Sequence, residues 1–422
     1  MEHLLPSSFM CLIFILGYVM IVMEHYLHVN KAAIALLSAS LLWTIVFVGF
    51  GHDFTHSMSF LSHNMAEVSE IVFFLLGAMT IVELIESHNG FVLLSKMGQG
   101  LSKKSAAAAL CFLTFFMSSV LDNLTTTLVM IALLKRLIEN RQERLMMGGL
   151  VVVAANAGGA WTPIGDVTTT MLWIKGNITT FHIVHALFLP SLVAMLVALA
   201  LLTWNMTGSF VAPQQKAADD QMALGGRRVF VLGVLTFLFV PIFKSVTHLP
   251  AYMGILMGLS ILWLITDFLH SRAKRPQLQV CHALTKIDSS SLLFFLGILL
   301  AIGALEQAGI LHSVATTVDN YVQNPHIVAT LIGLFSAIID NVPLVAAAMS
   351  MYDISLYPVD CAFWQLLAYC AGTGGSILLI GSAAGIAFMG MESVSFFWYM
   401  RKISLPALVS YFAGLVVYLL LI

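Results

Sequence analysis

Long apolar stretches separated by short polar segments run through almost the whole chain. A transmembrane helix needs about 20 consecutive apolar residues. The pattern predicts uninterrupted spans at residues 5–23, 32–50, 68–86, 183–206, 228–246, 251–269, 289–305 and 405–422. No basic segment precedes the first stretch, so we interpret it as a retained span rather than a signal peptide.

Four further apolar stretches are interrupted in the middle. Residues 145–174 and 362–389 are broken at the Gly-rich segments AANAGGAWTPIGDVTTT and AGTGGS. Gly and Pro disfavour continuous helix, and bare backbone at membrane depth survives only where it lines a protein cavity, so we predict broken helices there. Residues 106–138 and 326–351 carry Asp-Asn at their centres. We predict re-entrant helical hairpins there, with Asp122-Asn123 and Asp340-Asn341 at the two tips.

Composition and charge agree with a membrane protein. The chain is 59% hydrophobic and 9% charged, against roughly 25% charged residues in a soluble domain. The net charge of -2 gives no sign of nucleic-acid binding. Basic residues gather in segments 96–104, 141–144, 216–228, 272–286 and 401–402, whereas loops 51–67, 309–325 and 352–360 have none. The basic side is expected to face the cytoplasm, which gives ten spans, two hairpins and both termini outside.

An internal repeat divides the chain. Segments FLLG, SSVLDN and IGD of the first half align with FFLG, SAIIDN and IGS of the second at offsets of 216 to 220 residues. Each half has five spans, an odd number, so the halves are expected to be inverted relative to each other. We predict a first inverted repeat at 1–206, a cytoplasmic linker at 207–227 and a second inverted repeat at 228–422. The predicted fold class is an all-α polytopic membrane protein with about ten transmembrane helices and two re-entrant hairpins.

Carboxylates and neutral oxygens come together at the first tip and the first break. Small hard cations prefer oxygen ligands, and a proton competes with a cation for the same carboxylate. The alternatives are an ordinary solvated turn at Asp122 and a helix N-cap role for Asp166. Acids are rare at membrane depth, which favours an ion site. The candidates in this half are Asp122, Asn123, Thr125, Asn156, Asp166, Thr168 and Thr169.

The second half repeats this arrangement with fewer acids. Ser382 replaces Asp166 and Gly372 replaces Asn156, so the site is expected to be asymmetric. Serines in membrane helices often satisfy the local backbone instead of a ligand. The candidates in this half are Asp340, Asn341, Thr373, Ser376 and Ser382.

Other polar residues give weaker signals. Glu83, Glu86 and Glu306 lie near the ends of spans and are candidates for proton access, although span ends commonly carry acids. His52, His56, His63 and His88 are expected to be solvent-exposed rather than pH sensors. The five cysteines have no CxxC spacing, so neither a disulfide framework nor a metal site is predicted. The Gly-rich breaks lack the context of a phosphate-binding loop, and no cofactor is expected.

The motifs LDNLTTTLVM, NAGGAWTPIGDVTTTMLW, IIDNVPLVAAAM and GTGGSILLIGSAAG resemble the core signature of the NhaD-type sodium/proton antiporters, within the wider ion transporter superfamily. The resemblance covers residues 71–390. It implies exchange of Na⁺ or Li⁺ for H⁺, an elevator-like transport domain and a homodimer. By match to the motifs, it implies ion-handling roles for Asp122, Asn123, Asn156, Asp166, Thr168, Thr169, Asp340 and Asn341, with Ser376 and Ser382 as further candidates.

We therefore expect a multi-pass antiporter of the bacterial inner membrane, working by alternating access. Na⁺ is expected at Asp122, Asn123, Asn156 and Asp166, with proton exchange at Asp122 and Asp166. Three alternatives stay open: a sodium-coupled anion symporter of the same architecture, an intramembrane aspartyl enzyme, and an uncoupled channel. The acids at both tips argue against the symporter, and the inverted repeat argues against the enzyme.

Overall fold

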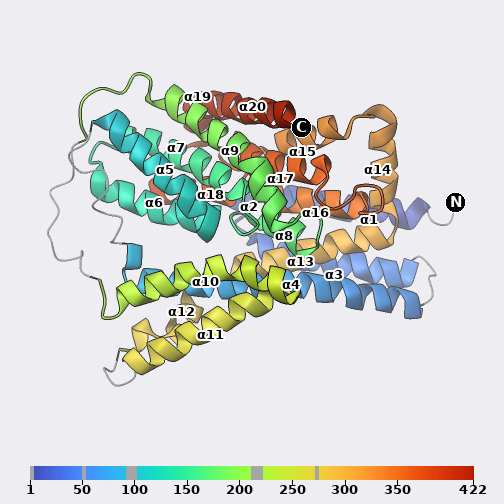
Figure 1. Ribbon diagram of the computed structural model, residues 1–422. Helices are drawn as coiled ribbons and strands as arrows, with labels where there is room; N and C mark the ends of the chain where they lie inside the picture. The colour runs from blue at the N-terminus through green and yellow to red at the C-terminus, as the bar shows by residue number, and fades with distance from the viewer. Residues whose placement is uncertain (1–3, 50–53, 92–101, 211–221, 271–274) are drawn as a thin grey trace.

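The computed structural model describes residues 4–49, 54–91, 102–210, 222–270 and 275–422, and these residues are helical with no β-strand among them (Figure 1). The middle of the predicted linker, residues 211–221, falls outside these ranges. The helices of the first half are α1 (Leu4–Val22), α2 (Glu24–Leu27), α3 (Lys31–Gly49), α4 (Phe54–Ser87), α5 (Lys103–Leu121), α6 (Asn123–Leu137), α7 (Arg141–Ala160), α8 (Val167–Ile174) and α9 (Thr180–Thr203).

The second half continues in the same style. Its helices are α10 (Gly226–Thr247), α11 (Ala251–His270), the 3₁₀ turn η2 (Pro276–Leu278), α12 (Val280–Lys286), α13 (Ser289–Gln307), α14 (Ile310–Tyr321), α15 (Pro325–Phe335), α16 (Asn341–Met351), α17 (Ala362–Gly374), α18 (Ala383–Glu392), α19 (Phe396–Lys402) and α20 (Ser404–Leu421). Within the described residues, eight helices are long and apolar enough to cross a membrane. The prediction of an all-helical, multi-pass membrane protein is confirmed.

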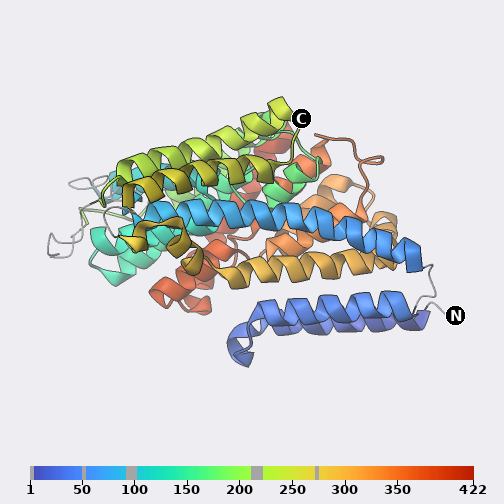
Figure 2. The same ribbon diagram turned by 90° about the horizontal axis from the view of Figure 1, so that it is seen from below.

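Helix α4 corrects one prediction. Residues 51–67 were expected to form a loop, but the helix already begins at Phe54 and has 34 residues. At 1.5 Å per residue it is about 51 Å long, well beyond the thickness of a hydrocarbon core. Figure 2 shows it as the long blue helix that crosses most of the length of the molecule. The polar residues at its start hid the helix from a hydropathy pattern, because they lie beyond the apolar stretch.

The expected exposure of the histidines is right at one position and wrong at another. His63 is exposed, whereas His88 is fully buried. His88 Nδ1 bonds the Leu84 carbonyl at 2.8 Å, and its Nε2 lies 2.9 Å from His270 Nε2. The end of α11 therefore covers His88 and supplies its polar partner. His52 and the side chain of His56 lie outside what the structure describes.

At each of the four interrupted regions one helix ends and another begins. Asp122 separates α5 from α6, and residues 161–166 separate α7 from α8. Asp340 precedes α16, and residues 375–382 separate α17 from α18. In Figure 1 the pair α5–α6 lies at the left end of the molecule and α14–α16 at the right end. The interrupted regions lie between these two ends.

The two halves repeat the same helix pairings. α1 packs on α3 as α10 packs on α11, and α5 packs on α7 as α15 packs on α17. α6 packs on α18 as α16 packs on α8, and α9 packs along α20. Hydroxyl contacts repeat as well, because Ser118 Oγ donates to the Ala155 carbonyl at 2.6 Å and Ser336 Oγ donates to the Ala371 carbonyl at 2.8 Å. The sequence repeat therefore corresponds to a repeat of three-dimensional contacts.

Two glycines allow the broken helices to approach their neighbours. A Cβ on Gly158 would lie 2.2 Å from the Phe115 carbonyl oxygen, and a Cβ on Gly374 would lie 2.0 Å from the Gly333 carbonyl oxygen. These distances are far inside van der Waals contact with rigid backbone. Glycine is required at both positions because the backbone of a neighbouring helix occupies the place of a side chain.

Candidate functional site

Four helices begin in the interrupted regions, and each begins with a polar N-cap. Asp122 caps α6, Asp166 caps α8, Asp340 caps α16 and Ser382 caps α18. Each side chain accepts a hydrogen bond from a backbone amide of its own helix. Helix N-termini favour negative charge. The N-cap position therefore stabilises carboxylates that would otherwise be costly in the interior of a membrane. The site thus contains three acidic caps and one neutral cap.

Asp122 has an unusual backbone. Its φ is 75° and its ψ is 159°, a region that residues with a side chain rarely adopt. Its carboxylate accepts hydrogen bonds from the Thr125 amide at 2.8 Å and from Thr125 Oγ1 at 2.9 Å. Asp340, at the second tip, has an ordinary φ of -48°. Such strain costs about 1–3 kcal/mol and persists mainly at functional sites, which distinguishes the first tip from the second.

Asn123, Asn156 and Ser382 form a continuous chain of hydrogen bonds. Asn123 Nδ2 donates to Asn156 Oδ1 at 3.0 Å, and Asn156 Nδ2 donates to Ser382 Oγ at 2.9 Å. All three side chains are almost completely buried. The chain joins the first tip to the first broken helix and then to the second broken helix.

Asp166 meets the second tip. Asn341 Nδ2 donates to Asp166 Oδ2 at 3.2 Å, and the Thr168 amide donates to Oδ1 at 3.4 Å. The Thr168 hydroxyl lies beside this carboxylate and interacts with it, although among the described residues its Oγ1 makes no hydrogen bond of good geometry. Asp122 and Asp340 lie close enough to Asp166 for electrostatic interaction. The result is a buried carboxylate with a buried, poorly bonded hydroxyl group beside it.

The remaining predicted hydroxyl ligands bond to backbone carbonyls. Thr169 Oγ1 donates to the Asp166 carbonyl at 2.9 Å, Thr373 Oγ1 to the Tyr369 carbonyl at 2.6 Å, and Ser376 Oγ to the Thr373 carbonyl at 2.6 Å. These bonds are the local backbone contacts that Ser and Thr often make in membrane helices. In the part of the chain that is described, no three His, Cys, Asp or Glu side chains gather as a metal site. A bound cation would therefore need neutral oxygens in addition to carboxylate among its ligands.

A cavity of about 540 Å³ reaches the first tip from one side. Glu83, Glu86 and Thr125 line it, together with Lys286. Glu83 forms an ion pair with Lys286 at 3.3 Å. Since Thr125 bonds directly to Asp122, this cavity connects the predicted proton-access glutamates to the first tip.

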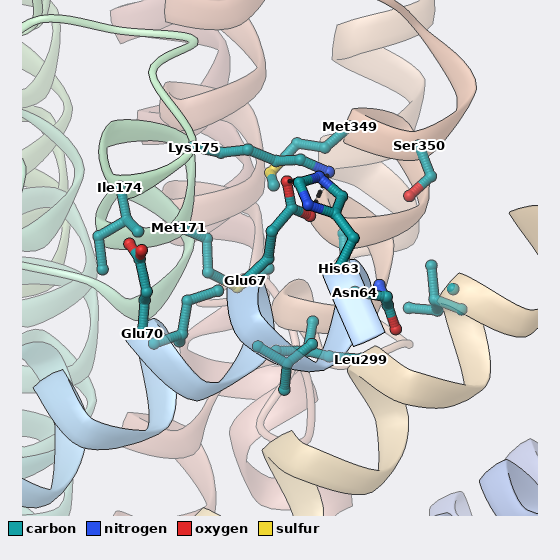
Figure 3. Close-up of a pocket in the computed structure, with 15 residues that line it drawn as sticks. His63, Asn64, Glu67, Glu70, Met171, Ile174, Lys175, Leu299, Met349 and Ser350 are labelled. Carbon is teal, nitrogen blue, oxygen red and sulfur yellow. Dashed lines mark ion pairs between the residues drawn. The ribbon is translucent and has the colours of Figure 1, made fainter. Parts of the chain in front are cut away.

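Two adjoining cavities, of about 280 and 400 Å³, share His63, Asn64, Glu67 and Lys175 in their walls. Figure 3 shows Glu67 between His63 and Lys175 in the smaller one, where the ion pairs measure 3.4 and 3.5 Å. Glu306 lines the larger one. Glu86 and Glu306 occupy matching positions of the repeat, so each half contributes one acid to a different cavity.

Sequence reasoning missed Lys244. Its Nζ lies 4.2 Å from the centre of the Trp173 ring and donates to the Trp173 carbonyl near the end of α8. This lysine joins α10 to the broken helix of the first half. Its place in the last turn of an apolar helix was visible in the sequence, but its partner was not.

Comparison with known proteins shows to which family the chain belongs. The sequence profile of the citrate transporter family (CitMHS) matches residues 18–365. The chain is 50% identical over 415 residues to "Sodium/proton antiporter 2" of Arabidopsis thaliana, covering 97% of this chain and 98% of that protein. "Sodium/proton antiporter 1" of the same plant is 51% identical over 413 residues, covering 97% of this chain and 72% of that protein. "Na(+)/H(+) antiporter NhaD" of Vibrio parahaemolyticus is 32% identical over 404 residues, covering 88% and 95%.

The helical fold, the interrupted helices and the family match define a polytopic membrane transporter rather than an enzyme. This sets aside the intramembrane aspartyl enzyme. Within the transporters, the chain belongs to the NhaD-type sodium/proton antiporter family.

Proposed function

We propose that this protein exchanges Na⁺ or Li⁺ for H⁺ across the membrane by alternating access, with Asp166 as the central ion-exchanging group. The observation that carries the proposal is the buried Asp166 carboxylate with the buried Thr168 hydroxyl beside it. An isolated buried charge is costly, so either a proton or a cation is needed to neutralise it. Because a bound proton excludes the cation and a bound cation excludes the proton, the carboxylate carries only one of them at a time. A carboxylate that is exposed alternately to the two sides of the membrane therefore exchanges protons for cations.

Asp122, Asn123 and Asn156 complete the proposed site from the first half. Asp122 supplies a second carboxylate that interacts electrostatically with Asp166. Asn123 offers an amide oxygen at the tip, and Asn156, whose Oδ1 accepts from Asn123 Nδ2, holds the tip against the first break. Asp340 and Asn341 act from the second tip, where Asn341 orients the Asp166 carboxylate.

The proposal includes two re-entrant hairpins, α5–α6 and α15–α16, inverted relative to each other. The pairing of α5 with α7 matches that of α15 with α17, and the pairing of α6 with α18 matches that of α16 with α8, which supports the repeat, although close packing of the two legs is seen only for α5 and α6. The cavities also support the proposal, because one reaches the first tip past Glu86 and the others reach α8 and α16 past Glu67 and Glu306. The cavity at Glu86 is assigned to the cytoplasmic side by the basic residues near it. We propose that the hairpins and broken helices move as an elevator-like unit, and that two copies form a homodimer.

The proposed location is the bacterial inner membrane. NhaD relatives from Vibrio parahaemolyticus and Vibrio cholerae support a bacterial membrane. The two relatives with about half of their residues identical come from a plant. Fractionation of the source cells distinguishes the inner membrane from any other membrane.

A sodium-coupled anion symporter is the second candidate, and the description "Citrate transporter" of the matching family favours it. An anion beside Asp166 would meet a carboxylate with two further acids nearby. Like charges in a low-dielectric site repel strongly. The carboxylates therefore favour cation exchange.

The test uses proteoliposomes that are acidic inside and contain a pH-sensitive dye. NaCl, LiCl, KCl and sodium succinate are added outside in turn to the wild type, Asp166→Asn and the control Asp267→Asn, which lies outside the site. We expect NaCl or LiCl to raise the internal pH in the wild type and the control, and not in Asp166→Asn. Uptake of succinate without any response to the chloride salts would replace the antiporter with the symporter.

A further inference from the structure

The inverted repeat places two equivalent junctions in the centre of the molecule. In each junction a tip asparagine faces one broken helix and the N-cap of the other. The first junction contains Asn123, Asn156 and Ser382. The equivalent positions of the second junction are Asn341, Gly372 and Asp166, from the alignment of the two halves. Two of the three positions therefore differ between the junctions.

The first junction is filled by its own side chains. The Asn156 amide lies between the tip and the cap, donating to Ser382 and accepting from Asn123. Both the donor and the acceptor side of this amide are used. Since the buried groups satisfy one another, the junction is complete without a ligand.

The second junction has no side chain at the position of Asn156. A Cβ on Gly372 would lie 3.3 Å from Asp166 Oδ2 and 3.2 Å from the Ala160 Cβ. Oδ2 of the Asp166 carboxylate thus lies next to the place where the first junction has an amide. A side chain at position 372 would therefore press against Oδ2 and against Ala160.

We propose that Gly372 determines which cations fit at Asp166, because any side chain at this position would crowd Oδ2. This inference rests on the proposed cation exchange at Asp166. Selectivity between hard cations depends on cavity size and on the number of oxygen ligands. A methyl group at this position reduces the space on one side of the carboxylate. The affinity of the site for a larger ion therefore falls more than its affinity for a smaller ion. Gly372 therefore acts as a specificity-determining residue.

The experiment compares the KM for Na⁺ and for Li⁺ in proteoliposomes for the wild type, Gly372→Ala and Gly390→Ala. Gly390 is the matched control, because a Cβ there has nothing within 4 Å. We expect Gly372→Ala to raise the KM for Na⁺ by about tenfold, the effect of one methyl group in a fitted pocket. The KM for Li⁺, the smaller ion, should rise much less, and the control should match the wild type for both ions.

A second variant controls for misfolding of Gly372→Ala. Gly372→Ala combined with Ala160→Gly removes the close contact between the two Cβ atoms while keeping the new methyl group beside Asp166 Oδ2. Folding is checked by a single peak in size-exclusion chromatography. A changed ratio of the Na⁺ and Li⁺ KM values in this folded double variant supports the inference.

Equal changes for both ions, or none, would overturn the role of Gly372 while leaving the antiporter intact. A wild type that shows no cation-driven proton movement would instead overturn the proposed function. The two failures are therefore distinguishable in one experiment.

Discussion

Arg144→Met should destabilise the protein by removing the partner of a buried acid. Arg144 Nε donates to Glu392 Oε1 at 2.8 Å, and its Nη1 donates to the Ile138 and Glu139 carbonyls at 3.0 and 3.2 Å. The Glu392 side chain is 3% exposed and that of Arg144 is 17% exposed. Arg141 also donates to the Glu392 carbonyl at 3.1 Å. These contacts join the start of α7 to the end of α18, and so connect the two halves.

The size of the effect follows from the burial. Removing one partner of a buried ion pair costs about 3–5 kcal/mol, because the other charge stays buried without compensation. Arg144 keeps some contact with water, so we expect the lower end, about 3 kcal/mol. Replacing both members by apolar residues is often nearly neutral. Arg144→Met with Glu392→Met should therefore recover most of the loss.

The assay is thermal unfolding in detergent at one heating rate for the wild type, the two single variants and the double variant. A large domain loses about 2 °C of Tm per kcal/mol, so Arg144→Met should lower the Tm by about 6 °C. The double variant should be more stable than Arg144→Met. A double variant whose decrease in Tm equals the sum of the decreases in the two single variants would refute the reasoning. Such additivity is expected of substitutions at independent sites.

Two further predictions concern packing and access. Gly158→Ala should give no folded protein in size-exclusion chromatography, because its Cβ would lie 2.2 Å from the Phe115 carbonyl oxygen. A normal elution profile would show that the two helices can separate. Glu86→Gln should raise the KM for Na⁺ added on the side of its cavity by about two- to threefold through lost electrostatic attraction. High choline chloride should remove this difference, because salt screens charges across an open cavity, and a difference that persists would contradict it.

The hydrophobic pattern was sufficient for most of the fold. Apolar runs predicted the helices, and the residues that break them predicted the interruptions. Asp122 separates α5 from α6 as expected, and α8 begins directly after Asp166. Such residues are costly in the middle of a membrane helix, so their positions carry structural information. The hydrophobic pattern missed the first turns of α4. A helix that extends beyond the hydrocarbon core of the membrane needs no apolar sequence there.

Side-chain pairing across the halves was beyond the sequence. His88 is buried because His270 lies 182 residues away on a different helix and covers it. Lys244 bonds the end of α8 only because α10 packs next to it. The positive φ of Asp122 depends on the geometry of the tip rather than on the residue type. Contacts of this kind arise from tertiary packing, and the residue pattern of a single sequence contains no signal for them.

The difference between Ser382 and Asp166 has a mechanical consequence. Helix α18 begins with a neutral cap, and the chain from Asn123 through Asn156 to Ser382 contains no group that ionises near neutral pH. This junction can therefore hold the first tip against both broken helices whichever ion is bound. The junction at Asp166 has the same place in the repeat, but under the proposed exchange its net charge changes when a proton or a cation leaves. An acid at position 382 would add a fourth carboxylate to three that already lie close together, and its repulsion would oppose that closed contact.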